Sequence, residues 1–171
     1  MGKKSKIAAY RANRAPDART VHNLFGEKGG WDPLHGIHES RTDTYIKTVK
    51  PRTEGQRLLM EAIHKHNLVL SIGPAGTGKT FLAIAAAVEA FEKGKVERII
   101  LSRPAVEAGE KIGYLPGDLQ DKMAPYLRPL YDALNDRMGL KRLKQHIESG
   151  EIEIAPIGYM RGRTLNNAFV V

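Results

Sequence analysis

Apolar residues recur along this chain in two rhythms, one typical of buried strands and one typical of helices. Short apolar runs of strand length lie at 68–72 and 96–102, and residues 151–155 alternate between charged and apolar side chains. An Ala-rich stretch at 81–91 and a longer segment at 118–148 are instead typical of helices. A strand, a helix and a strand in this order predict a right-handed parallel crossover, and therefore an α/β fold.

Two helical segments carry signals that set their limits. A helix over 53–66 is expected to open at Thr53, because Thr53 and Gln56 have the spacing of a capping box. The longer segment contains Pro125 and Pro129, and we expect these prolines to break or kink it.

The strand pattern also sets the limits of the folded domain. Residues 45–49 alternate like a short first strand, and residues 168–171 begin a last one. Residues 1–43 hold few periodic apolar residues and several Gly and Pro, which predicts a weakly ordered extension. We therefore divide the chain into a basic extension at 1–43 and one domain at 44–171.

The segment between the first long strand and its helix matches the phosphate-binding P-loop, G-x-x-x-x-G-K-[ST], at every position. Its glycines permit positive φ and leave room for a phosphate against backbone N–H groups, and the positive end of the following helix adds to the attraction. Lys79 is expected to reach the β- and γ-phosphates, and the Thr80 hydroxyl to hold Mg²⁺. The predicted nucleotide-binding residues are Gly73, Pro74, Ala75, Gly76, Thr77, Gly78, Lys79 and Thr80.

Composition limits the compartment and the partners. The 171 residues contain no cysteine, which excludes a disulfide framework and a thiolate metal site. No apolar run reaches the length of a membrane span and no apolar leader opens the chain, so we expect a cytoplasmic protein. The formal net charge is +8, and residues 1–52 hold 11 Lys and Arg against 5 Asp and Glu. This basic segment is expected either to attract RNA or another single-stranded nucleic acid, or to serve as a solvated tail.

Three blocks of the sequence resemble one family, the PhoH-like proteins, named for a phosphate-starvation-inducible ATPase of bacteria and found also in phages. The blocks are GPAGTGKT at 73–80, RPAVEAGEKIGYLPGDLQDKMAPYLRPLYDAL at 103–134 and YMRGRTLNNAFVV at 159–171. The resemblance covers roughly residues 50–171. It implies a P-loop NTPase of the helicase-like branch, a three-layer sandwich with a parallel sheet, and ATP with Mg²⁺ as its ligands.

Two further residues are candidates for the site. In helicase-like ATPases a glutamine placed like Gln56 reads the adenine edge with its amide, whereas a capping box gives Gln56 a structural role, and the sequence leaves both open. Arg163 is a candidate arginine finger at the γ-phosphate, acting in cis or from a neighbouring subunit of a ring-like homo-oligomer. Contact with a nucleic acid phosphate and ordinary solvation are the alternatives for Arg163.

The resemblance makes ATP binding the leading functional hypothesis, with MgATP hydrolysis by water attack in the complete family domain. In the family, the strand at 168–171 runs on into acidic Walker B residues, which this sequence does not contain. Those carboxylates hold Mg²⁺ and position water, so we expect nucleotide binding rather than turnover from a chain incomplete at its C-terminus. The alternatives are a nucleic-acid-binding protein or an accessory subunit that uses nucleotide as a switch.

Overall fold

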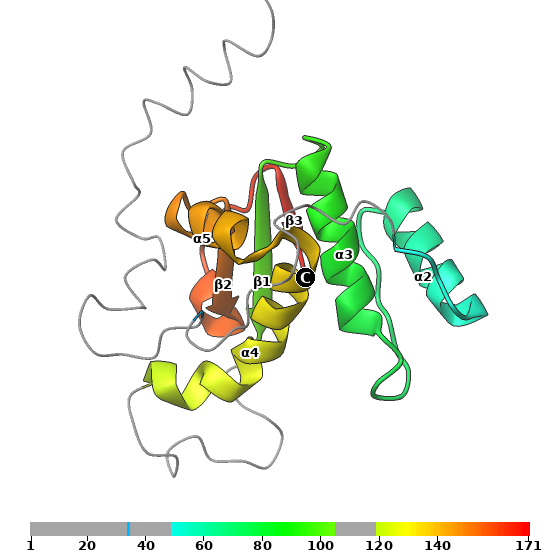
Figure 1. The fold of residues 1–171 in the computed structure, drawn as a ribbon, viewed down its shortest axis with the longest axis horizontal. Coiled ribbons are helices and arrows are strands. Elements are labelled where there is room, and N and C mark those ends of the chain that lie inside the picture. The colour runs from blue at the N-terminus through cyan, green and yellow to red at the C-terminus, as the bar shows by residue number, and fades with distance from the viewer. Residues whose placement is uncertain (1–33, 35–48, 105–118) are drawn as a thin grey trace, which may run out of the picture.

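The computed structural model describes Leu34, residues 49–104 and residues 119–171, which are drawn in colour in Figure 1. Within these ranges, helices and parallel strands form an α/β fold, as the sequence predicts. The extension predicted at 1–43, other than Leu34, lies outside the described residues, and so does the strand predicted at 45–49, other than Val49.

The described sheet has three parallel strands in the order β2-β1-β3. The central strand β1 (Arg98–Arg103) pairs with β2 (Ile152–Pro156) on one side and with β3 (Ala168–Val170) on the other. The register sets Ile99 beside Ile152, so that apolar side chains of neighbouring strands share one face. The three strands predicted after the P-loop are thereby confirmed, with small shifts at their ends.

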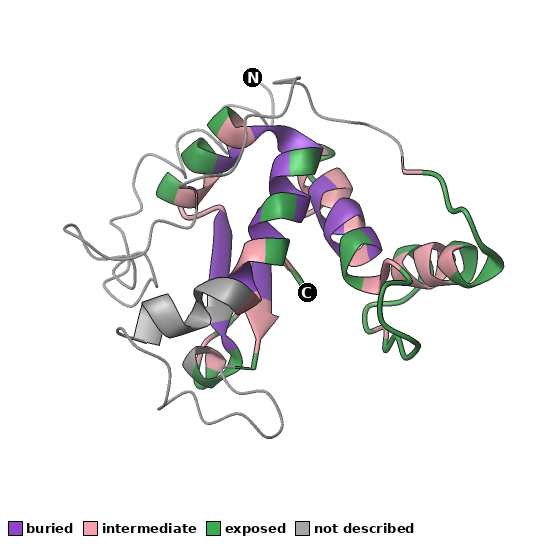
Figure 2. Cartoon of the chain, turned by 60° about the horizontal axis from the view of Figure 1, so that its bottom comes forward, coloured by how far each residue is buried: buried purple, intermediate pink, exposed green. Residues whose placement is uncertain are grey.

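Three helices pack against this sheet and supply most of the core (Figure 1). They are α3 (Lys79–Glu92), α4 (Leu119–Met138) and α5 (Leu140–Glu148). Figure 2 shows the buried residues in purple on the strands and on these helices. The most deeply buried members of the core are Ile84, Ala87, Val88, Ile99, Leu101, Leu130, Tyr131, Leu134, Met138, Leu143 and Ile152.

The long helical segment is divided at Gly139 and not at either proline. Helix α4 runs through Pro125 and Pro129 to Met138, although it changes direction along its length (Figure 1). Gly139 has φ of 79°, a conformation that glycine adopts without the steric cost of a side chain, and α5 begins at the next residue. Of the two outcomes expected at the prolines, the break is therefore corrected, while the change of direction agrees with a kink.

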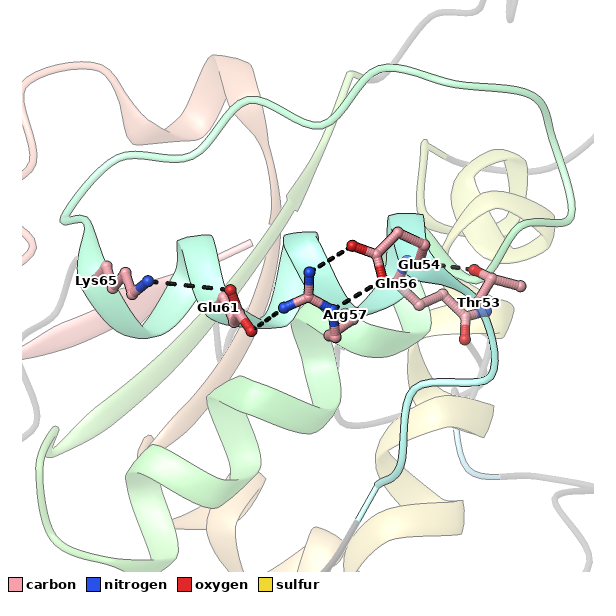
Figure 3. Close-up of polar contacts among 6 residues, drawn as sticks. All are labelled: Thr53, Glu54, Gln56, Arg57, Glu61 and Lys65. Atoms are coloured by element: carbon pink, nitrogen blue, oxygen red, sulfur yellow. Dashed lines mark hydrogen bonds and ion pairs between the residues drawn. The ribbon is translucent and has the colours of Figure 1, made fainter.

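Helix α2 (Glu54–Lys65) packs against α3 and has no fully buried residue. The Thr53 hydroxyl caps it by accepting a hydrogen bond from the Gln56 backbone N–H, as predicted. On its exposed side, Arg57 bridges Glu54 and Glu61, as Figure 3 shows. Helix α2 is therefore held by a cap, by surface ion pairs and by contact with one neighbouring helix.

The segment at 68–72, predicted as a buried strand, is not a strand in the structure. It runs from α2 to the P-loop without pairing to the described sheet, and Leu68, Leu70 and Ile72 are 80%, 84% and 97% exposed. A sheet strand needs a neighbouring strand to satisfy its backbone N–H and C=O groups, and none of the described strands lies beside this segment. The crossover predicted from this segment to β1 is therefore also corrected.

Candidate nucleotide-binding site

The backbone of the P-loop bends at two glycines before α3 begins. Gly76 and Gly78 have φ of 75° and 85°, which is the left-handed region that non-glycine residues rarely adopt. Gly78 is the N-cap of α3, it makes no side-chain cap hydrogen bond, and the first turn of α3 holds no acidic residue. The free N–H groups at the start of α3 are therefore available to an anion, because no capping side chain accepts their hydrogen bonds.

The Lys79 ammonium group lies inside the loop. Its Nζ donates to the carbonyl oxygens of Gly73 and Pro74, at 2.9 and 2.6 Å, and to the Thr77 hydroxyl at 3.3 Å. The Thr77 hydroxyl in turn donates to the Pro74 carbonyl at 3.0 Å. These bonds hold a positive charge at the place where the motif predicts β- and γ-phosphates.

Gln56 joins helix α2 to the P-loop. Its Oε1 accepts a hydrogen bond from the Arg52 backbone N–H at 2.8 Å, and its Nε2 donates to the Thr77 carbonyl at 3.1 Å. Thr53 therefore provides the predicted cap. The Gln56 side-chain amide bonds to Arg52 and to the loop and not back to Thr53. The structure brings Gln56 to the phosphate loop, 21 residues away in the sequence.

A cavity of about 540 Å³ adjoins the loop. It is a hollow open to solvent and not an enclosed cavity. Phe81 supplies an aromatic ring and Gln56 an amide to its wall. Two cationic side chains and two aliphatic side chains also line it. The lining residues are Val49, Lys50, Arg52, Gln56, Gly78, Phe81 and Leu82.

Arg163 contacts the carboxylate of Glu153. Its guanidinium pairs with both carboxylate oxygens, one of them at 2.7 Å, and Arg98 donates to the same carboxylate at 3.1 Å. Glu153 is on β2 and is only 7% exposed, and Figure 1 places β2 across β1 from α3. A buried carboxylate needs such partners, so Arg163 is engaged in the fold, and a finger role, in cis or from a neighbouring subunit, stays a prediction.

One residue of the P-loop motif, Thr80, could bind Mg²⁺ through its hydroxyl group. Thr80 stands exposed in the first turn of α3, next to Lys79, as the motif requires. No group of three or more His, Cys, Asp or Glu that could hold a metal occurs among the residues the structure describes. The residues therefore fit an ion that arrives with phosphate oxygens and water as its other ligands, which is the usual manner of Mg²⁺.

The prediction that the chain binds nucleic acid is untested by this geometry. The basic segment expected to attract nucleic acid falls almost entirely outside the described residues. Across helices α2 to α5, none is long and apolar enough to cross a membrane.

Comparison with known proteins places the P-loop and its surroundings in a family. A family model described as PhoH-like protein matches residues 48–171, which is well over half of the chain. The chain belongs to the PhoH-like protein family. The resemblance inferred from the three sequence blocks is thereby confirmed.

Curated relatives extend well beyond the matched part. The chain is 55% identical over 125 residues to a PhoH-like protein of Bacillus subtilis (strain 168), a match covering 73% of this chain and 39% of that protein. For a PhoH-like protein of Mycobacterium tuberculosis (strain H37Rv), identity is 56% over 125 residues, covering 73% of this chain and 36% of the relative. The chain is also 39% identical over 163 residues to protein PhoH of Escherichia coli (strain K12). That match covers 94% of this chain and 45% of that protein. The chain thus spans less than half the length of these PhoH-like relatives.

Proposed function

We propose that this PhoH-like chain binds a nucleoside triphosphate, with the phosphates in the P-loop and the base in the adjoining cavity. The observation that carries the proposal is the position of the Lys79 ammonium, held inside the loop by the carbonyls of Gly73 and Pro74. A phosphate oxygen is a better acceptor for an ammonium group than a neutral carbonyl, because both partners are then charged. A bound triphosphate would therefore draw Lys79 from these carbonyls without moving it out of the loop.

The base would occupy the cavity, which is lined by both the phosphate loop and helix α2. Phe81 offers a ring for contact with a base, and Val49 and Leu82 add apolar surface. Lys50 and Arg52 place positive charge at the same wall, next to a polyanionic ligand. We propose ATP and not GTP from the family resemblance alone.

MgATP hydrolysis is a separate proposal, made for the complete PhoH-like domain. In this chain Lys79 would neutralise phosphate charge and Thr80 would hold the metal, whereas no group of three or more acidic, His or Cys side chains that could hold a metal occurs among the described residues. We therefore expect binding from this chain with little or no phosphate release.

Isothermal titration of MgATP into the wild type tests the proposal, with Lys79→Ala as the decisive variant. Lys141→Ala is the matched control, because Lys141 is an exposed lysine on α5, away from the loop. We expect wild type and Lys141→Ala to bind equally and Lys79→Ala to bind at least tenfold more weakly, since a charge-assisted contact is lost. Phosphate release is followed in the same samples. Absence of binding by the wild type, or equal binding by Lys79→Ala, would overturn the proposal.

A further inference from the structure

The amide of Gln56 contacts the phosphate loop from outside it. Besides the hydrogen bond from Nε2 to the Thr77 carbonyl, this nitrogen lies close to Gly78, 3.4 Å from where a Cβ atom would stand on that residue. A Cβ atom at position 78 would be in van der Waals contact with this nitrogen, so the amide lies directly against the loop. The other end of the amide is anchored by the Arg52 backbone N–H.

We propose that Gln56 is a positioning residue for the phosphate loop, which raises affinity for the triphosphate itself whatever base is attached. The peptide bond between Thr77 and Gly78 is planar and trans, so its C=O and N–H groups point in opposite directions. By holding the Thr77 carbonyl toward α2, Gln56 turns the Gly78 N–H away from α2, where a phosphate oxygen can accept it. This inference rests on the proposed binding of a nucleoside triphosphate in the P-loop.

A positioning role differs from base reading in one measurable way. A primary amide has two N–H groups and two carbonyl lone pairs, so Gln56 retains capacity for a base beside its two protein contacts. A residue that only reads the base changes affinity for ATP and leaves affinity for inorganic tripolyphosphate unchanged. A residue that sets the loop changes both affinities by the same factor.

The decisive variant is Gln56→Met, which keeps the length and neutrality of the side chain and removes both amide hydrogen bonds. Gln145→Met is the matched control, because Gln145 is exposed on α5. Thr53→Ala is the second control, because it weakens the cap of α2 while leaving the Gln56 amide intact. Affinities for MgATP and for tripolyphosphate with Mg²⁺ are measured for the wild type and all three variants.

We expect Gln56→Met to weaken binding of both ligands by the same factor, about three- to tenfold, as is usual for the loss of one hydrogen bond. The two controls should stay within twofold of the wild type. Loss confined to MgATP would show that Gln56 reads the base and would overturn the positioning role. Equal loss in Thr53→Ala would also overturn it, because the effect would then come from loosening α2.

A second measurement separates this inference from the proposed function. In ¹H–¹⁵N spectra recorded without ligand, Gln56→Met should shift the Gly78 amide resonance, and Gln145→Met should not. If the wild type binds neither ligand, the proposed function fails, and this resonance alone decides whether Gln56 sets the loop. An unchanged Gly78 resonance would overturn the inference.

Discussion

The two halves of this molecule are built in opposite ways. Around β1, the strands and the helices α3, α4 and α5 bury Ile99, Leu101 and Leu134 completely, whereas α2 and the segment at 68–72 bury no residue fully (Figure 2). The residues that carry the proposed binding chemistry lie mainly in the exposed half, on a loop and at helix ends. The comparison indicates that the stability of this chain and its proposed ligand binding depend on different residues. Substitutions can therefore change one property without the other.

The largest expected effect is on the buried half. Leu134→Ala should lower the free energy of unfolding by about 2–5 kcal/mol, because this side chain of α4 is fully buried in the core. Leu70→Ala makes the same chemical change at an 84% exposed position and should stay within about 0.5 kcal/mol of the wild type. Urea unfolding followed by circular dichroism measures both. Equal losses would contradict the division into two halves.

The next effect concerns the charged cluster on β2. Glu153→Ala should cost about 2–3 kcal/mol of unfolding free energy, because it leaves Arg98 and Arg163 without their shared carboxylate in a partly buried place. Glu148→Ala is the control, since Glu148 is an exposed glutamate at the end of α5. The same urea titrations apply. A loss no greater than that of the control would mean that the cluster contributes nothing to the fold.

A smaller and local effect is expected at the start of α2. Thr53→Ala removes the cap, worth about 1 kcal/mol, from a helix that packs mainly on α3. Amide hydrogen exchange in α2 should therefore become about fivefold faster, while amides of β1 keep their rates. Faster exchange in both elements would show that α2 and the sheet unfold together, and the comparison drawn above would fail.

The smallest effect depends on pH. The hydrogen bonds from Arg57 lower the pKa of the Glu54 carboxyl below its ordinary value, and Lys93 does the same for Glu89. Since the folded pKa is the lower one, each contact stabilises the fold above the unfolded pKa and is lost as pH falls through the folded pKa. In a ¹³C titration, Arg57→Gln should raise the Glu54 pKa toward its ordinary value and leave that of Glu89 unchanged. An ordinary Glu54 pKa in the wild type would contradict this account.

Much of the fold could be predicted from the sequence because local patterns determine it. Alternation at 151–155, the Ala-rich run of α3 and the Thr53 cap each act through near neighbours, and all three are confirmed. The P-loop residues could be found because the motif specifies backbone shape as well as side chains, and Gly76 and Gly78 have the expected positive φ.

The failures arose where a residue depends on a distant partner. A short apolar run at 68–72 predicts a buried strand, but only a neighbouring strand makes it one. Glu153 stands at the polar position of an alternating strand, which by itself predicts exposure, and its burial depends on Arg98 and Arg163. The contact between Gln56 and Thr77 spans 21 residues and no spacing rule would have found it.

The central claim is that the P-loop binds nucleotide through Lys79, at the start of α3, independently of the stability of the fold. The most direct test is MgATP titration of the wild type and of Lys79→Ala, on samples whose unfolding free energies are measured in parallel. The account predicts equal stability of the two proteins without ligand and affinity at least tenfold weaker in the variant. Equal affinity, or weaker binding that follows only from a less stable variant, would contradict it.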